Sequence, residues 1–144
     1  NALVNNHASE IAFADVSEAI RIVNIFGFHL AKLDIRQNSR FHELALAQLM
    51  QAAQLNGEEF LNLENKDRIA YITRELDSTR PFTHPNMTLG DEARATVDCF
   101  RVLDKHINVY GTEALGSLIV SMTRNVSDLL LVYLLQMNYH YKVQ

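Results

Sequence analysis

Hydrophobic and polar residues follow distinct patterns along the chain, and two of these patterns predict strands: an alternation with a period of two residues and a short continuous apolar run. Residues 28–36, FHLAKLDIR, alternate polar and apolar side chains, which is the two-residue period of a strand. On this strand the charged side chains share one face, and they are Lys32, Asp34 and Arg36. Residues 115–122, LGSLIVSM, form a nearly continuous apolar run. Such a run predicts a second strand, buried on both faces as in a parallel sheet.

A longer spacing predicts helices before, between and after the strands. The chain has only 5 Gly and 2 Pro, so few residues interrupt a helix. Asp15 or Ser17 is expected to cap the first helix and Gly27 to end it, while Asn38 or Ser39 caps the next. Ser127 is expected to cap the last, which is apolar nearly all round and therefore predicted to be enclosed. The predicted helices are 17–26, 39–56 (closing near Asn56-Gly57), 58–63, 66–76, one that begins at Asp91, and 128–137, with a loop over 78–90.

The order of these elements indicates a predominantly helical α/β fold with two short parallel strands. A strand followed by a helix occurs twice, and a long helical crossover separates the two occurrences. We expect one fragment of a domain in four segments. These are leading helices (1–28), the first strand and helix (29–56), the helical crossover (57–108), and the second strand and helix (109–144).

Composition narrows the class of protein. The 144 residues suit one domain, and 48% hydrophobic with 21% charged residues is ordinary for a globular protein. A net charge of -4 without a basic run argues against a nucleic-acid partner, and the longest apolar run is too short for a membrane span of about 20 residues. The single Cys99 favours a reducing compartment. Both ends look cut, so we expect a piece of a longer protein.

Arg36 is the candidate binding residue. If helices cover the outer face of its strand, the charged face points into a barrel interior or a crevice, where unpaired charges cost several kcal/mol each. Lys32 and Asp34 can neutralise each other, whereas Arg36 lies last, at the carboxyl end where α/β barrels gather their sites. Its planar fork of donors suits a phosphate or a carboxylate. The alternative is a solvated strand face without a ligand.

Other candidate residues favour structural roles. The six histidines show no metal-ligand spacing, and His42 either faces the same site as Arg36 or, as the favoured alternative, lies on the surface. Ser127-Asp128 suits a helix cap, and Arg74 and Arg80 suit the carbonyl groups at a helix end. There is no glycine-rich phosphate loop, no nucleophile elbow and no convergent acid pair for Mg²⁺. The chain therefore shows one half of an anion site, at Arg36, and no residues for reaction chemistry.

Three stretches resemble phosphoenolpyruvate carboxylase. FGFHLAKLDIRQNSRFH resembles the family's FGxxLxxLDIRQES-x-RH, and RELDSTRPF resembles RELxSxRPL. GSLIVSMTRNVSDLLLVYLLQ resembles YVISMAxxPSDVLAVxLL. The three come in the family's order and cover residues 26–136.

The resemblance implies a cytoplasmic carbon–carbon lyase that joins bicarbonate to phosphoenolpyruvate, giving oxaloacetate and phosphate with Mg²⁺ or Mn²⁺. It implies a homotetramer of helix-rich (β/α)8 barrels of the TIM type, in which LAKLDIRQ and LIVSM are the first two strands. Arg36 matches the arginine of the family's DIRQ motif and is implied to bind substrate.

The departures from the family pattern are few, but several of the family's catalytic motifs do not occur in these residues. Asn38 replaces Glu, Phe41 replaces Arg, and Val126 stands where the family often has Pro. The TAHPT histidine motif, the metal-binding acids and the GRGG loop do not occur in these residues. We therefore expect no catalytic residue and no metal ligand in this segment, so that alone it binds no cofactor, is inactive, and self-associates or is marginally stable.

Two alternatives from other classes stay open. A helical protein-interaction module predicts an exposed apolar groove and no preference for anions. A stand-alone sensor of phosphate ligands predicts that phosphoenolpyruvate binds this chain through Arg36.

Overall fold

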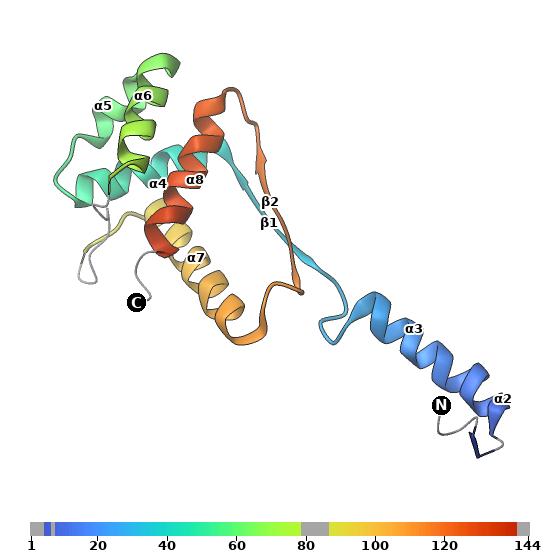
Figure 1. Cartoon of the computed structure of the whole chain (residues 1–144). Coiled ribbons are helices and arrows are strands. Elements are labelled where there is room, and N and C mark those ends of the chain that lie inside the picture. The colour runs from blue at the N-terminus through green and yellow to red at the C-terminus, as the bar shows by residue number, and fades with distance from the viewer. Residues whose placement is uncertain (1–4, 7, 79–86, 141–144) are drawn as a thin grey trace. The chain divides into compact units, whose positions relative to one another are not determined.

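The chain is predominantly helical and contains a two-stranded sheet (Figure 1). A computed structural model describes residues 5, 6, 8–78 and 87–140. Contacts divide the chain into a first unit, Asn1–Asp34 with Glu113–Ser117, and a second unit, Ile35–Thr112 with Leu118–Gln144. In order, the elements are α2 (Ser9–Ile11), the π-helical turn η1 (Ala12–Val16), α3 (Ser17–Phe26), β1 (Leu33–Asn38), α4 (Ser39–Ala52), α5 (Gly57–Asn62), α6 (Asn65–Leu76), α7 (Asp91–Tyr110), β2 (Leu115–Ser121) and α8 (Val126–His140). The predicted α/β class and element order are confirmed.

The first unit is dominated by the helical run α2–η1–α3. Gly27 ends α3 as predicted, because its φ of 59° favours glycine and its N–H bonds to the Val23 carbonyl at 2.8 Å. The predicted cap by Asp15 or Ser17 is wrong, since Val16 precedes α3 in a helical conformation and no side chain caps it. The helical turn η1 runs straight into α3, so the N–H groups that a cap would satisfy already lie within a helical run.

The two strands are paired and run parallel. At one end, the Leu33 N–H donates to the Ala114 carbonyl at 2.9 Å, and just beyond the other end the Ser39 hydroxyl donates to the Met122 carbonyl at 2.8 Å. Residue numbers therefore rise together along β1 and β2, which is the parallel arrangement predicted from the helical crossover between them.

β2 is not buried on both faces, so that part of the prediction is wrong. Leu118 and Val120 are half-buried and Leu118 packs on the hydrophobic core, but Ile119 between them is 36% exposed. A continuous apolar run indicates a strand that is covered on both faces when all of its neighbouring elements are in place. The described residues cover only one of these faces.

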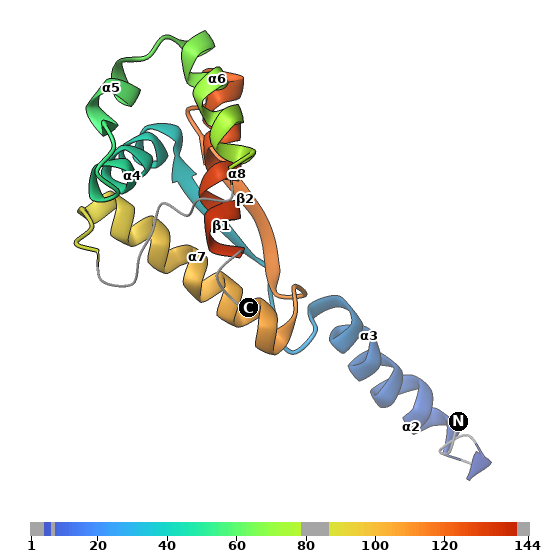
Figure 2. The same cartoon turned by 60° about the vertical axis from the view of Figure 1, so that its left-hand side comes forward.

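The core lies in the second unit, where α4 packs against α5, α7 and α8, and α8 also packs against α6 (Figure 2). Burying a large aliphatic or aromatic side chain stabilises a fold by roughly 1.5–3 kcal/mol, so this cluster is the main source of stability in the unit. Its buried members are Leu46, Leu49, Met50, Phe60, Ile72, Ala93, Val97, Phe100, Leu131, Leu134 and Leu135.

The boundary between α4 and α5 differs from the prediction. Asn56-Gly57 does not close α4, which ends at Ala52; instead Asn56 caps α5 by accepting the Glu59 N–H at 3.1 Å. Asn and Gly are common at both ends of helices, so the pair alone does not say which helix it serves. The loop predicted over 78–90 lies mostly outside the described residues, and α7 begins at Asp91 as predicted.

α8 is enclosed on one side only, which corrects the prediction of an enclosed helix. Leu131, Leu134 and Leu135 are buried, whereas Leu129 and Tyr133 are each 53% exposed. Among the described helices, none combines the length and the apolar character that crossing a bilayer requires.

Candidate anion-binding site

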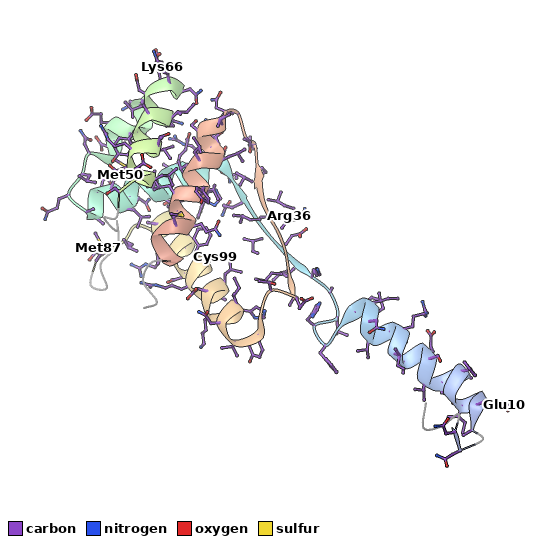
Figure 3. The ribbon with its side chains drawn as sticks, viewed as in Figure 1. Glu10, Arg36, Met50, Lys66, Met87 and Cys99 are labelled. Atoms are coloured by element: carbon purple, nitrogen blue, oxygen red, sulfur yellow. The ribbon has the colours of Figure 1, made fainter. Side chains whose placement is uncertain are left out.

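Arg36 extends from β1 on the face opposite Ile35. Ile35 is half-buried and Arg36 is exposed, as the alternation of a strand requires, and Figure 3 shows the Arg36 side chain at the strand pair. Lys32 and Asp34 are exposed as well, so the residues that the structure describes do not enclose the charged face. The role of Arg36 in anion binding stays a prediction.

Asp34 connects the two strands. Its carboxylate accepts the backbone N–H of Ser117 at 3.0 Å. A Cβ added at Gly116 would lie 2.2 Å from Asp34 Oδ1, so glycine leaves the room that this carboxylate occupies. The charged face thus includes one residue that fixes the register of the strands.

The residues at the carboxyl ends of the strands are held in place by short side chains. Asn38 caps α4, since its Oδ1 accepts the Phe41 N–H at 2.8 Å, which confirms the predicted cap. Ser39 is 2% exposed, and its hydroxyl donates to the carbonyl of Met122, which directly follows β2. Met122 has a φ of 56°, a left-handed conformation that costs a non-glycine residue on the order of 1 kcal/mol.

A charged cluster lies next to these ends, and we call it the Glu43 cluster. It comprises Glu43, Arg40, Arg68, Arg124 and Asp128. Glu43, in α4, is 1% exposed and is contacted by three guanidinium groups: Arg40 at 2.9 Å, Arg68, and Arg124. A buried carboxylate without such partners would cost several kcal/mol, so these pairs allow Glu43 to be ionised inside the fold.

Electrostatics in the cluster favour the charged forms. Burial alone would raise the pKa of the Glu43 carboxyl, but hydrogen bonds from Arg40 and Arg124 and the charge of Arg68 lower it below its ordinary value. The pKa of Asp128 is lowered in the same way, because bonds from Arg124 outweigh the effect of burial. Hydrogen bonds to Asp128 and Glu43 raise the pKa of the Arg124 guanidinium.

Asp128, rather than Ser127, accepts the free backbone N–H groups at the start of α8. Its carboxylate accepts the backbone N–H of Arg124 at 2.8 Å and of Asn125 at 3.4 Å. Ser127 was predicted as the cap, but α8 begins at Val126 and the buried Ser127 hydroxyl donates to Asn65 Oδ1 at 2.7 Å. Either residue type can cap a helix, and the tertiary contact to Asn65 decides between them.

His42 is buried rather than on the surface, which corrects the favoured alternative. It is 4% exposed in α4, burial lowers its pKa, and among the described residues its Nδ1 has no hydrogen-bond partner. Its helical spacing from Ala45, Leu46 and Leu49 was a signal for burial in the sequence.

Arg74 lies in the last turn of α6, as the helix-end prediction requires, with its guanidinium 5.2 Å from the centre of the Tyr71 ring. Both residues line a hollow of about 430 Å³ formed by α4, α5, α6 and the turns between them. Arg80 lies outside the described residues.

The described part of the chain does not bring metal ligands together. Over residues 5, 6, 8–78 and 87–140, no group of three or more His, Cys, Asp or Glu is placed to hold a metal ion. Cys99 is a free, half-buried cysteine, and burial raises the pKa of its thiol.

The sequence did not predict the Glu43 cluster. Arg40 and Glu43 are spaced to meet on one helix, and that local pair was the available signal. Arg68 and Arg124 are 25 and 81 residues from Glu43 along the chain, so their meeting depends on the tertiary fold.

Comparison with known proteins gives the same family by two routes, a family model and individual relatives. A model of the phosphoenolpyruvate carboxylase family matches residues 1–144. A phosphoenolpyruvate carboxylase of Rhodopseudomonas palustris (strain ATCC BAA-98 / CGA009) is 40% identical over 129 residues, which is 90% of this chain and 14% of that protein. One of Bradyrhizobium diazoefficiens is 39% identical over 134 residues, 93% of this chain and 14% of that protein. The chain therefore spans about 14% of the length of these relatives.

Proposed function

Because the chain belongs to the phosphoenolpyruvate carboxylase family, we propose that it works as one segment of a complete enzyme that carboxylates phosphoenolpyruvate. The reaction uses bicarbonate and gives oxaloacetate and phosphate, as a carbon–carbon lyase of carbon fixation and the tricarboxylic acid cycle. The observation that carries this proposal is the match over residues 1–144, together with relatives of that name. The complete protein is proposed to be a cytoplasmic homotetramer.

The segment's proposed contribution is to bind the substrate's anionic groups through Arg36. Its guanidinium stands on an exposed strand face, near the carboxyl end of β1, where a planar fork can contact a phosphate or carboxylate with two parallel bonds. Phosphoenolpyruvate carries both groups. Ionic hydrogen bonds of this kind bind more strongly than neutral ones, so Arg36 would contribute both affinity and orientation.

The architecture proposed for the complete enzyme is a (β/α)8 barrel in which β1 and β2 are the first two strands. Two parallel strands, each followed by a helix, support this arrangement. Ile35 and Leu118 are half-buried, and the strand positions next to them are more exposed. In a barrel the face away from the helices is the interior, and Arg36 would then point inward.

The metal and the reacting base are assigned to other segments of the enzyme. The described residues do not fit a Mg²⁺ or Mn²⁺ site, since they provide no group of three ligands. The isolated segment is accordingly proposed to be inactive and to bind no metal.

The test is the Arg36→Ala variant in the full-length protein of the same gene. We expect kcat/KM for phosphoenolpyruvate to fall about 100-fold, equivalent to roughly 2.7 kcal/mol, because a charge-assisted bidentate contact is lost. Lys32→Ala, an exposed neighbour before β1, is the control and should change kcat/KM less than twofold. Unchanged kcat/KM in Arg36→Ala would refute the role of Arg36, and a full-length protein without carboxylase activity would refute the proposed function.

A further inference from the structure

The loop of residues 122–125, which joins β2 to α8, is tied down at each end. Near β2, the Ser39 hydroxyl donates to the Met122 carbonyl at 2.8 Å. Near α8, the Asp128 carboxylate accepts the N–H groups of Arg124 and Asn125. A loop with this many fixed backbone groups presents its side chains in a defined place.

Arg124 is the charged side chain of this loop, and the Glu43 cluster holds it. Its Nη2 donates to Glu43 Oε1 and, at 3.1 Å, to Asp128 Oδ1. The Glu43 and Asp128 side chains are each 1% exposed, so they form a rigid and desolvated anchor. Two buried carboxylates without a cation would cost several kcal/mol, so moving Arg124 out of this position is unfavourable.

Arg124 nevertheless keeps part of its guanidinium available. Its side chain is 51% exposed, and its bonds to other described residues use Nε and Nη2 but not Nη1. Three arginines meet two carboxylates in the Glu43 cluster, which leaves one net positive charge. An excess positive charge with a free donor at a surface attracts an anion.

Arg36 and Arg124 belong to the same edge of the strand pair. Arg36 lies near the carboxyl end of β1, and Arg124 follows closely after β2 ends at Ser121. Since β1 and β2 are parallel neighbours, their carboxyl ends meet at one edge. Both residues are also in the second unit of the chain.

We propose that Arg124 is a second residue that binds the anionic groups of the substrate, and that Glu43 is a positioning residue that holds Arg124 in place. This inference rests on the proposed function. Glu43 itself does not touch the ligand, because its carboxylate is buried and already accepts bonds from Arg40, Arg68 and Arg124.

The experiment measures KM and kcat for phosphoenolpyruvate, together with Tm, in the full-length protein. We expect KM to rise about 10-fold in Arg124→Ala and about 5-fold in Glu43→Gln, with kcat within about twofold. The double variant should have the KM of Arg124→Ala alone, because Glu43 acts through Arg124. Asp98→Asn breaks the exposed Asp98–Arg101 pair on α7 and is the matched control, with KM unchanged.

Several results would overturn the inference. A lower Tm with unchanged KM in both single variants would make the cluster merely structural, and multiplicative effects in the double variant would separate Glu43 from Arg124. If Glu43→Gln does not fold, Arg124→Lys decides the question, because residue 124 is half-exposed and the variant keeps the charge. An intermediate KM supports the inference and an unchanged KM refutes it. If KM is unchanged in Arg124→Ala and Glu43→Gln while Arg36→Ala still lowers kcat/KM, this inference is refuted and the proposed function is not.

Discussion

At the scale of single residues, Glu43 shows how a charge becomes part of a core. It lies in α4 at a position with 1% exposure, and three guanidinium groups from α4, α6 and the loop after β2 compensate its charge. Such an arrangement gives little stability relative to an apolar core, but removing one of the charged groups leaves the others uncompensated and destabilises the fold. Acid removes the charge of the carboxylate and leaves the arginines in place.

We therefore predict that acid destabilises the second unit through Glu43 and Asp128. Their pKa values are lowered in the folded state, so the stabilisation is fully present above the unfolded values of about 4. It is lost as pH falls through the lower, folded values. Urea unfolding of the chain at pH 7 and pH 3 should show lower stability at pH 3. The double variant Glu43→Gln/Asp128→Asn should have a smaller difference between the two pH values.

Glu18→Gln provides the control for this pH effect. Glu18 pairs with Arg21 at 2.7 Å, but both side chains are exposed, at 50% and 63%, and exposed pairs contribute little to stability. The dependence on pH should match that of the unaltered chain. A double variant that keeps the full pH dependence would show that other groups cause the acid sensitivity.

At the scale of elements, the close approach of α5 to α4 shapes the second unit. Gly57 begins α5 and is buried, and a Cβ added there would lie 2.1 Å from the Ala47 carbonyl oxygen in α4. Real Cβ atoms do not approach backbone oxygens so closely, so glycine is required by packing. The same contact brings Phe60 of α5, 1% exposed, into the core.

We predict that Gly57→Ala destabilises the chain by about 3 kcal/mol, since α5 must move away from α4 to admit the methyl group. Urea unfolding measures the loss. Glu58→Ala changes the next residue, which is exposed in α5, and should alter stability by less than about 0.5 kcal/mol. Equal stability of the two variants would contradict the packing argument.

At the scale of the whole molecule, apolar surface remains uncovered. α3 has no buried residue, and Ile20, Ile25 and Phe26 are 55%, 60% and 48% exposed. Phe28, which follows α3, is 96% exposed. Exposed apolar side chains in such number on one segment indicate an interaction site or a cause of aggregation.

The isolated chain is therefore predicted to self-associate. Sedimentation velocity over a range of concentrations should show the monomer converting to dimers or larger species. Ile25→Ser/Phe28→Ser should shift this equilibrium toward the monomer, because less apolar surface is removed from water on association. Val109→Ser, at a 62% exposed position on α7, is the control and should not change it. A stable monomer at every concentration would refute the prediction.

Some elements followed from local sequence alone, and particular residues show why. Gly27 ends α3 and Asn38 caps α4, since both act on backbone groups within four residues of themselves. The parallel order of the strands followed from the helices between them. The alternation over residues 33–36 placed Ile35 and Arg36 on opposite faces.

Other features needed contacts that local patterns do not contain. Asn56-Gly57 serves α5 because Gly57 packs on Ala47, and Ser127 bonds to Asn65 instead of capping α8. The favoured of two alternatives placed His42 on the surface, although its helical spacing aligns it with core residues and it is buried. The apolar run of β2 predicted two buried faces, and one is covered.

The sequence by itself determined the element order, the parallel strands, the place of Arg36 within the first strand and the resemblance to phosphoenolpyruvate carboxylase, because periodicity, caps and motifs are local properties. Only the tertiary structure decided the Glu43 cluster and the anchoring of the loop at Met122. The contacts of Glu43 with Arg68 and Arg124, and of Ser39 with Met122, join residues that are 25 to 83 positions apart along the chain. Charges so far apart interact only where packing of the helices has brought them together and excluded water.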